Sequence, residues 1–396
     1  MWGWRACYQR KLLHRVARSA GRVTILLALA LSLAACTASW QVTVSQPDGN
    51  FFLVDAKVLH GLDDFSEQVE GKQAISVERV LVAAGHSVVD ELVVSAKEAE
   101  EVHSFEWTSA ADGAWWLYDG SVLVGGERVL ASHLEVAPSP LLEHAEAAIT
   151  DIAPTTCAAL GLRAPEQFTG RALESLPVDR AVLIFLDGFG YVRYTEALAQ
   201  GLIPFLSALG EPLIALATYP PITSVSTASL LTGAGPEVHG VDQRGIRKTE
   251  TETLFDVAAS AGLEVVAVEG ESLAFELRGA KLRLSGDLDG NGTTDDNVLA
   301  NALTVLRGGA PDLLFVHFHG IDDAGHTYGP GAPQERAAIQ EEDAAVGRIM
   351  ELLPEHTLVI IFADHGMHKV NEEGRLGNHG HLISRDMFIP IFLASK

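Results

Sequence analysis

From about residue 181 onwards, runs of apolar residues alternate with stretches in which apolar positions recur every three or four residues. Nearly unbroken apolar runs are typical of strands buried on both faces of a parallel sheet. The stretches between them have the period of amphipathic helices. We expect strands in the segments 181–188, 263–270, 312–320 and 356–366, and helices in the segments 194–202, 224–233, 252–262, 295–309 and 334–353. This pattern predicts an α/β domain in which helices sandwich a mostly parallel sheet.

Residues 37–140 have a different pattern, in which short β-type segments are separated by turn signals. The expected strands lie in the segments 40–44, 51–59, 77–85, 91–96 and 114–126. No cluster of ligand-type residues or nucleophiles stands out among them. The sequence predicts a small β-rich accessory domain here, followed by a catalytic domain at residues 141–396.

The first 36 residues have the pattern of a targeting segment, with six Lys or Arg and no Asp or Glu. An apolar run from Val23 to Cys36 follows the basic part and is too short to span a bilayer as a helix. Its end, Leu33-Ala34-Ala35-Cys36, resembles the bacterial lipoprotein signal, which is cut before the Cys. We predict a signal peptide at residues 1–36, lipidation of Cys36, and an exported chain that meets the membrane of the bacterial cell envelope through this lipid anchor. An ordinary secretory signal with a chance Cys is the alternative.

Composition narrows the choice of partners. The chain has 396 residues, of which 47% are hydrophobic and 20% charged, so a sizeable core is expected. Its formal net charge is −24, which repels nucleic-acid backbones, and no nucleic-acid binding surface is expected. Bound divalent metals reverse the field locally, so an anionic substrate remains compatible with this charge.

Acidic and histidine side chains gather at the ends of the predicted strands. In a parallel sheet, ligands bind beyond the carboxyl ends of the strands. Each residue alone has an ordinary explanation, such as a helix cap, a solvated loop His or a helical pair. Their coincidence favours a site for one or two divalent metals, with zinc first among them. The residues are Asp187, Asp322, His326, Asp364, His365 and His379.

A hydroxyl group is expected at the start of a helix. Pro220 and Pro221 block a helix before them, so Thr223 falls at or just before a helix N-terminus. Backbone N–H groups of a first helical turn can bind phosphoryl oxygens, and a hydroxyl there can attack. An ordinary N-cap is the alternative for Thr223, and Ser224, Ser226 and Thr227 compete with it as nucleophiles.

Six strings occur in the order LDGFGY, YPPITSVSTASLLTG, PEVHG, GIDDAGHTYGP, ADHGM and GNHG. Together they resemble the nucleotide pyrophosphatase/phosphodiesterase (type I phosphodiesterase) branch of the alkaline phosphatase superfamily. The resemblance implies an alkaline phosphatase-like fold, zinc at two sites and Thr223 as the nucleophile that forms a phospho-threonine. It implies one metal held by Asp187, Thr223, Asp364 and His365, and another held by Asp322, His326 and His379, with His381 as an alternative to His379.

Three features depart from that family pattern. Arg244 stands where the branch has an Asn that contacts the phosphoryl group. An Arg can bind a dianionic phosphate with two hydrogen bonds, so this difference favours a phosphomonoester or a terminal phosphate as the substrate. The segment that begins at Ile149 resembles an element that follows the last metal-binding His in many members, although here it precedes Asp187. The Cys or Ser motif of sulfatases is absent from the sequence, which argues against sulfate esters.

An Asp-rich loop at residues 287–296 alternates oxygen ligands and has a Gly at its sixth place. Its twelfth place is Val298, so the bidentate Glu of a calcium loop is missing. The loop is either a calcium site or a turn that caps the next helix. The candidate ligands are Asp287, Asp289, Asn291 and Asp295.

These observations predict a metal-dependent hydrolase of small-molecule phosphate esters, either a phosphodiesterase resembling nucleotide pyrophosphatases or a phosphatase. Thr223 and Arg244 are the expected catalytic residues. Within enzymes, the alternative is a phosphomonoesterase or phosphomutase of the same superfamily. A non-catalytic envelope lipoprotein is the alternative from another class.

Overall fold

The computed structural model describes residues 40–45, 51–85, 88–96, 102–106, 114–124, 126–173, 177–372 and 374–396. The predicted signal peptide and Cys36 lie outside the described residues. The chain divides into two compact units, one ending at Ser139 and the other formed by Pro140–Lys396. Among the described residues, no helix combines the length and the apolar character that crossing a membrane requires.

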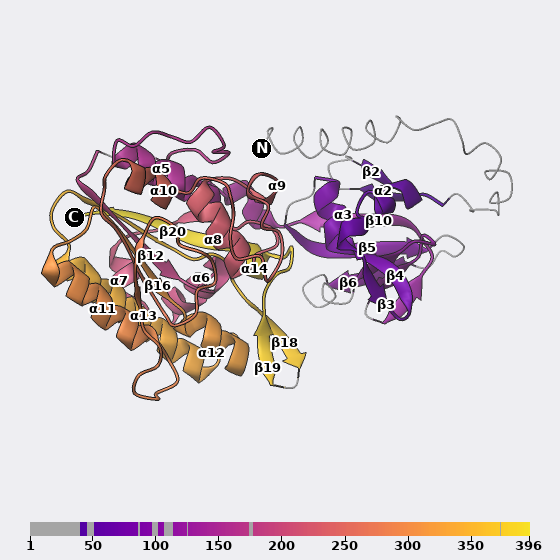
Figure 1. Ribbon diagram of the computed structural model, residues 1–396. Coiled ribbons are helices and arrows are strands. Elements are labelled where there is room, and N and C mark those ends of the chain that lie inside the picture. The colour runs from indigo at the N-terminus through magenta and orange to yellow at the C-terminus, as the bar shows by residue number, and fades with distance from the viewer. Residues whose placement is uncertain are drawn as a thin grey trace. The chain divides into compact units, whose positions relative to one another are not determined.

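The first unit is rich in β-structure, as expected (Figure 1). One five-stranded sheet has the order β2-β1-β10-β5-β6, and the other has the order β3-β4-β7-β8-β9. The elements are β1 (Val42–Ser45), β2 (Phe51–Val54), α2 (Ala56–His60), β3 (Glu67–Val69), β4 (Lys72–Ser76), α3 (Val77–Ala83), β5 (Val89–Ala96), β6 (Val102–Glu106), β7 (Trp115–Leu117), β8 (Val122–Val124), β9 (Glu127–Val129) and β10 (Ala131–Pro138).

Two predicted strands of this unit are wrong in part or in whole. The segment 77–85 forms helix α3 rather than a strand, because the side chain of Ser76 accepts a hydrogen bond from the Arg79 N–H and caps the helix. The segment 51–59 is a strand only as far as Val54. There the Asp55 carboxylate accepts a hydrogen bond from the Val58 N–H and begins α2.

The second unit alternates strands and helices. Its strands are β11 (Ala147–Ala148), β12 (Arg180–Leu186), β13 (Leu213–Leu216), β14 (Val265–Glu269), β15 (Lys281–Leu284), β16 (Leu313–Phe318), β17 (Thr357–Phe362), β18 (His368–Glu372), β19 (Arg375–Asn378) and β20 (Phe388–Ser395). Its α-helices are α5 (Ile152–Ala159), α6 (Tyr191–Ala199), α7 (Pro204–Ala208), α8 (Thr223–Thr232), α9 (Pro236–His239), α10 (Leu254–Ser260), α11 (Asp295–Gly308), α12 (Gly320–Tyr328), α13 (Pro333–Leu352) and α14 (Ser384–Met387).

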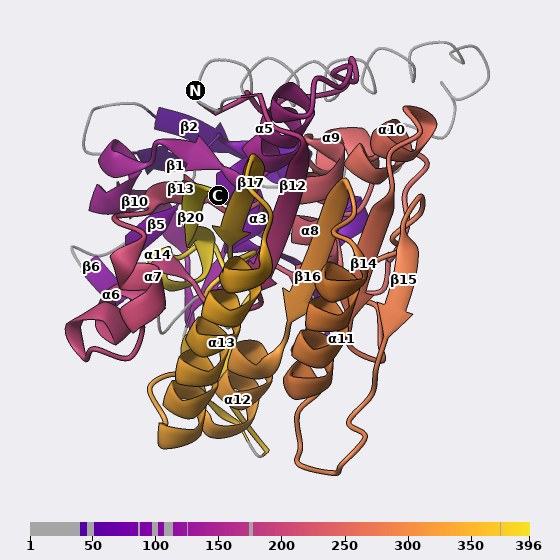
Figure 2. The same cartoon turned by 90° about the vertical axis from the view of Figure 1, so that its left-hand side faces the viewer.

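An eight-stranded sheet with the order β11-β13-β20-β17-β12-β16-β14-β15 forms the centre of this unit. Only β20 runs antiparallel to its neighbours, and all other adjacent pairs are parallel. Helices α11 and α13 lie over one face, and α5, α8 and α10 lie over the other (Figures 1 and 2). The predicted fold class, a mostly parallel sheet sandwiched by helices after a β-rich region, is confirmed.

The central strands are buried on both faces, which explains their unbroken apolar sequences. Every residue of β16 and β17 is buried, and so is every residue of β12 except Arg180. These strands lie side by side with their carboxyl ends at one edge of the sheet, so the residues that follow them are brought together.

The segment from Ile149 packs against α8 although it precedes β12 in the chain. It begins with a short 3-10 helix, Ile149–Asp151, which leads into α5. Further on, the backbone N–H groups of Thr169 and Gly170 donate to the Gly233 carbonyl at the end of α8, at 2.8 and 3.1 Å. The segment therefore supports the helix whose first residue is Thr223.

Candidate active site

The carboxyl edge of the central sheet collects most of the candidate ligands. Asp187 follows β12 directly, and Asp364 and His365 follow β17. Asp322 and His326 lie on α12, which begins beyond the end of β16. His379 comes directly after β19, the second strand of the hairpin formed by β18 and β19.

One group of ligand atoms consists of Asp187, Asp364 and His365, whose ligand atoms lie within 4.8 Å of one another. The Nε2 atom of His365 is 3.4 Å from Asp187 Oδ1 and 3.3 Å from Asp364 Oδ2. The hydroxyl of Thr223 is 3.3 Å from the same Nε2 atom. These four residues are the ones that the sequence motifs assigned to a single metal.

A second group consists of Asp322, His365 and His379, again within 4.8 Å. His379 Nε2 is 3.8 Å from Asp322 Oδ1, and the rings of His365 and His379 stack with centroids 3.6 Å apart. His326 stands just outside this group, although its Nε2 atom is 3.2 Å from Asp322 Oδ2. The two groups therefore share His365 and form one continuous centre.

The orientation of the three imidazole rings suits metal binding. Each ring donates its Nδ1–H to a backbone carbonyl: His365 to Gly366 at 3.0 Å, His326 to Gly377 at 2.8 Å, and His379 to Pro221 at 2.8 Å. Such bonds fix the tautomer and leave Nε2 with its lone pair, as in metal-ligating histidines. All three Nε2 atoms face carboxylates or ligand atoms of the centre.

The carboxylates of the centre are short of partners. Among the described residues, nothing donates a hydrogen bond to the buried oxygens Oδ1 of Asp187, Oδ1 of Asp322 and Oδ2 of Asp364. Burial raises the pKa of Asp364 well above its usual value, and the charges of Asp187 and Asp322 raise it further. A buried set of repelling carboxylates needs a compensating cation to be fully ionised, so these residues fit divalent metal ions.

Burial also keeps His379 neutral, which a metal ligand requires. Burial lowers the pKa of His379 well below its usual value, and the neighbouring His365 and Arg244 lower it further. For Asp187, hydrogen bonds rather than burial decide the direction of the pKa shift. Burial alone would raise its pKa, but hydrogen bonds from His317 and His319 outweigh burial and hold the pKa well below its usual value.

The four competing hydroxyl groups of α8 differ in where they point. Ser226 donates to the Asp364 carbonyl at 3.0 Å and Thr227 donates to the Thr223 carbonyl at 2.6 Å, so both hydroxyls are engaged by backbone. Ser224 is buried, with 6% of its surface exposed. Thr223 is the first residue of α8, is only partly buried and faces the His365 ring.

Two arginines lie against the second group. Arg244 Nη2 is 3.4 Å from His379 Nε2. Arg375, on β19, places its Nη2 atom 3.0 Å from Nδ1 and 3.2 Å from Nε2 of His326. Burial lowers the pKa of Arg244, and the positive charge of Arg375 lowers it further, so the two guanidinium groups are close enough to repel. Arg375 was not among the predicted site residues, and its only signal in the sequence is its place three residues before Asn378 of the GNHG string.

His381 and the Asp-rich loop have other contacts. The backbone N–H of His381 donates to Asp386 Oδ2 at 3.0 Å, and its ring lies against His368 rather than in either ligand group. In the loop, Asp287 accepts backbone N–H groups of Gly290, Asn291 and Gly292. The Asp295 carboxylate accepts those of His319 and Gly320. These bonds favour the turn interpretation of the loop.

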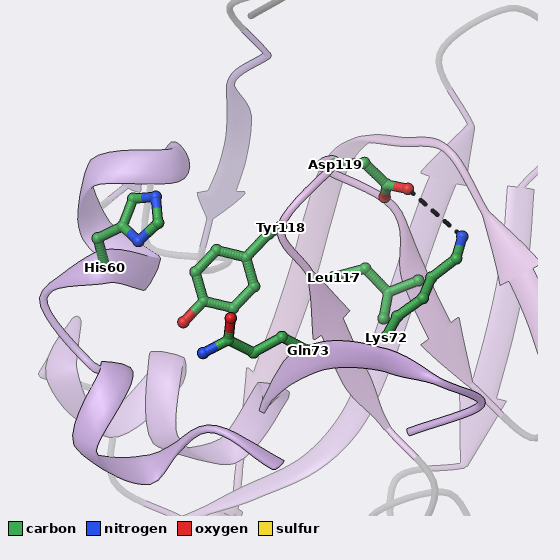
Figure 3. A pocket seen from close by; sticks show the side chains of 6 residues that line it. All are labelled: His60, Lys72, Gln73, Leu117, Tyr118 and Asp119. Atoms are coloured by element: carbon green, nitrogen blue, oxygen red, sulfur yellow. Dashed lines mark ion pairs between the residues drawn. The ribbon is translucent and has the colours of Figure 1, made fainter. Parts of the chain in front are cut away.

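A surface pocket of about 430 Å³ lies in the first unit (Figure 3). Within it, Lys72 and Asp119 form an ion pair at 3.8 Å, and the Tyr118 hydroxyl donates to Asp63. The pocket is lined by His60, Lys72, Gln73, Leu117, Tyr118 and Asp119. Its Lys72 and Asp119 neutralise each other, unlike the carboxylates at the sheet edge, so the pocket does not resemble a metal centre.

Parts of this chain are similar in sequence or fold to known proteins. It is 33% identical over 103 residues to the mouse (Mus musculus) GPI ethanolamine phosphate transferase 3 catalytic subunit, covering 26% of this chain and 9% of that protein. It is 23% identical over 218 residues to venom phosphodiesterase 2 of Crotalus adamanteus, covering 48% and 27%. The solved phosphonoacetate hydrolase of Sinorhizobium meliloti 1021 is 18% identical, with a TM-score of 0.40 over 52% of this chain and 60% of that one. The chain thus spans less than two thirds of the length of each of these proteins.

A sequence profile gives the family directly. The profile of the type I phosphodiesterase / nucleotide pyrophosphatase family matches residues 181–262 and 264–387, just over half of the chain. The match includes all seven residues that the motifs assigned to the metals, together with Arg244. The resemblance inferred from the six strings is confirmed, and the chain belongs to the type I phosphodiesterase / nucleotide pyrophosphatase family.

Proposed function

We propose that this chain is a zinc-dependent hydrolase of small-molecule phosphate esters that works through a phospho-threonine at Thr223. One observation carries the proposal: a hydroxyl at the start of a helix lies 3.3 Å from an imidazole that faces two buried carboxylates, each with one oxygen that lacks a hydrogen-bond partner among the described residues. The ligand set of Asp and His suits zinc among the divalent metals. Asp187, Asp364 and His365 would hold one ion beside Thr223, and Asp322, His326 and His379 would hold the other.

Thr223 supplies the nucleophile. When bound, divalent metals supply Lewis acidity, which lowers the pKa of a nearby hydroxyl and neutralises phosphoryl oxygens. Thr223 Oγ1 loses its proton and forms a bond to phosphorus, while the bond from phosphorus to the ester oxygen breaks. That oxygen takes up a proton, which balances the one that Thr223 released, and leaves as an alcohol. Water then attacks the phospho-threonine, which releases phosphate and restores the hydroxyl. The first N–H groups of α8 would donate hydrogen bonds to the phosphoryl oxygens in both steps.

The substrate is a phosphate ester with a doubly charged or terminal phosphate. Arg244 and Arg375 lie beside the centre and repel each other, and an anion bound between them would relieve this repulsion. A monoester dianion or the terminal phosphate of a nucleotide supplies more charge for this purpose than a diester. Diester hydrolysis, the activity in the family's name, is the second candidate.

Replacing Thr223 with Ala tests the nucleophile. We expect hydrolysis of both p-nitrophenyl phosphate and bis-p-nitrophenyl phosphate to fall by at least about a thousandfold, since covalent catalysis and its positioning are lost together. Zinc content, measured by mass spectrometry of the purified protein, should stay near that of the wild type. The wild type, stopped with acid during turnover, should yield a phosphorylated peptide that contains Thr223.

Thr227→Ala is the matched control, because Thr227 lies one turn further along α8 and its hydroxyl donates to the backbone carbonyl of Thr223. This variant should keep its activity within a few-fold. Near-wild-type rates in Thr223→Ala would sink the proposed nucleophile. Full zinc loading of the wild type without hydrolysis of either compound would instead favour the non-catalytic lipoprotein.

A further inference from the structure

A second set of buried imidazole and carboxylate groups, which the sequence motifs do not mark, lies next to the proposed centre. Glu269 is the last residue of β14, His317 lies in β16, and His319 follows the end of β16. Because β12, β16 and β14 are neighbours in the sheet, these side chains lie beside Asp187 at the end of β12. Glu269 and His317 are 3% and 1% exposed, so neither is an ordinary solvated surface group.

Glu269 engages one nitrogen of each imidazole ring. Its Oε1 atom is 2.8 Å from His317 Nδ1, and its Oε2 atom is 3.0 Å from His319 Nε2. With these two nitrogens donating to Glu269, the opposite nitrogen of each ring points at Asp187. It donates a second proton there in the absence of a metal ion, and it would bind the ion once that proton has left. A carboxylate that accepts the outer N–H of an imidazole is the usual support of a metal-ligating histidine.

Both remaining nitrogens face the same oxygen atom. His317 Nε2 is 3.2 Å and His319 Nδ1 is 3.5 Å from Asp187 Oδ2. The other oxygen of that carboxylate, Oδ1, faces His365 instead, at 3.4 Å. The Asp187 carboxylate therefore stands between two different sets of nitrogens, with one oxygen directed to each.

The distances match those of a small metal site. Ligand atoms placed about 2.1 Å from a tetrahedral ion lie roughly 3.4 Å apart. The ligand atoms of Asp187, His317 and His319 all lie within 4.8 Å of one another. The His317 ring is also held in place, since it stacks on Phe185 with centroids 3.7 Å apart and planes inclined by 4°.

We propose that Asp187 Oδ2, His317 Nε2 and His319 Nδ1 bind a third divalent metal ion, with Glu269 as the residue that positions both imidazoles. Two imidazole nitrogens and one carboxylate oxygen suit zinc and the other first-row transition metals better than magnesium or calcium. Asp187 bridges this ion and the one beside Thr223, so the third ion fixes the orientation of a ligand of the proposed catalytic centre.

Metal counting tests this site without relying on activity. Full-length protein is loaded with zinc, passed through gel filtration and analysed by mass spectrometry for zinc per chain. We expect three ions in the wild type and the loss of one in His319→Ala, a change at the most exposed of the ligands. His60→Ala, which removes an exposed histidine of the first unit, should keep all three.

Glu269→Gln gives a second measurement that leaves every proposed ligand in place. We expect it to weaken binding of the most weakly held ion by about 10- to 100-fold in competition with a chelator. Two ions in the wild type, or an unchanged count in His319→Ala with unchanged affinity in Glu269→Gln, would mean that both histidines are protonated partners of the carboxylates. The third site would then be refuted while the proposed function stands, whereas a wild type without any zinc would refute both.

Discussion

The guanidinium groups of Arg244 and Arg375 lie against the rings of His379 and His326. Two cations beside a metal centre repel each other and the metal unless an anion lies between them. We therefore expect Arg375→Ala to lower kcat/KM for p-nitrophenyl phosphate by roughly tenfold or more, since a hydrogen bond to a charged group contributes about 1.5–3 kcal/mol. Kinetics on the zinc-loaded enzyme measure this change.

The diester bis-p-nitrophenyl phosphate serves as the comparison, because its phosphate carries a single negative charge. Its kcat/KM should fall less in Arg375→Ala, and the same ordering should hold in Arg244→Ala. Arg375→Lys should restore only part of the rate, because an ammonium group lacks the planar fork of a guanidinium. Equal losses for monoester and diester would contradict the preference for a dianionic phosphate.

The residues that could be predicted from the sequence are those that follow apolar strands directly or stand in a family string. Asp187, Asp364 and His365 meet both conditions, and they lie together as expected. Arg375 and Glu269 could not be found in this way. Arg375 reaches His326 because β19 packs against α12, and Glu269 reaches His317 because β14 pairs with β16. Neither contact can be seen in the local sequence.

Helices α6 and α13 are joined by a buried ion pair. Arg193 Nε donates to Glu335 Oε1 at 2.7 Å and Nη2 to Oε2 at 2.5 Å, and both side chains are at most 3% exposed. Replacing Arg193 with Met would leave the Glu335 carboxylate buried without its cation. We expect the free energy of unfolding to fall by about 3–5 kcal/mol, measured by far-UV circular dichroism in urea.

Arg385→Ala is the matched control, because Arg385 pairs with Glu196 at 3.4 Å with 45% of its side chain exposed. Loss of this surface pair should cost at most about 1 kcal/mol. Equal effects of the two substitutions would show that the buried pair contributes no more than a surface one.

Helices and strands could be told apart most easily where a strand is buried on both faces. The distinction was harder where an element buries only one face. The strands β12, β16 and β17 are buried on both faces, so their apolar runs leave no helical period. In α3, Val77, Val80 and Leu81 are fully buried at helical spacing, but the β-branched residues of that segment also suit a strand. The cap from Ser76 decides between them, and its effect depends on a single hydrogen bond.

At the scale of the whole molecule, the net charge of −24 bears on where the protein is held. An acidic body is repelled by an anionic membrane surface, so a lipid that holds it at the envelope would have to overcome this repulsion. We propose that this lipid is carried by Cys36. Cys36→Ser should move the protein from the membrane fraction to the soluble fraction of a bacterial host and abolish labelling with radioactive palmitate.

Cys157→Ser is the appropriate control, because Cys157 is 1% exposed in the core of the second unit, where burial raises the pKa of its thiol to about 12. A buried, protonated thiol is a poor nucleophile, so this variant should remain labelled and membrane-bound. An ordinary secretory signal predicts something different: wild type and Cys36→Ser would both be exported, unlabelled and soluble. The anchor is supported if Cys36→Ser loses both the label and the membrane attachment while Cys157→Ser keeps both. Chance adsorption to membranes would be the same in both variants.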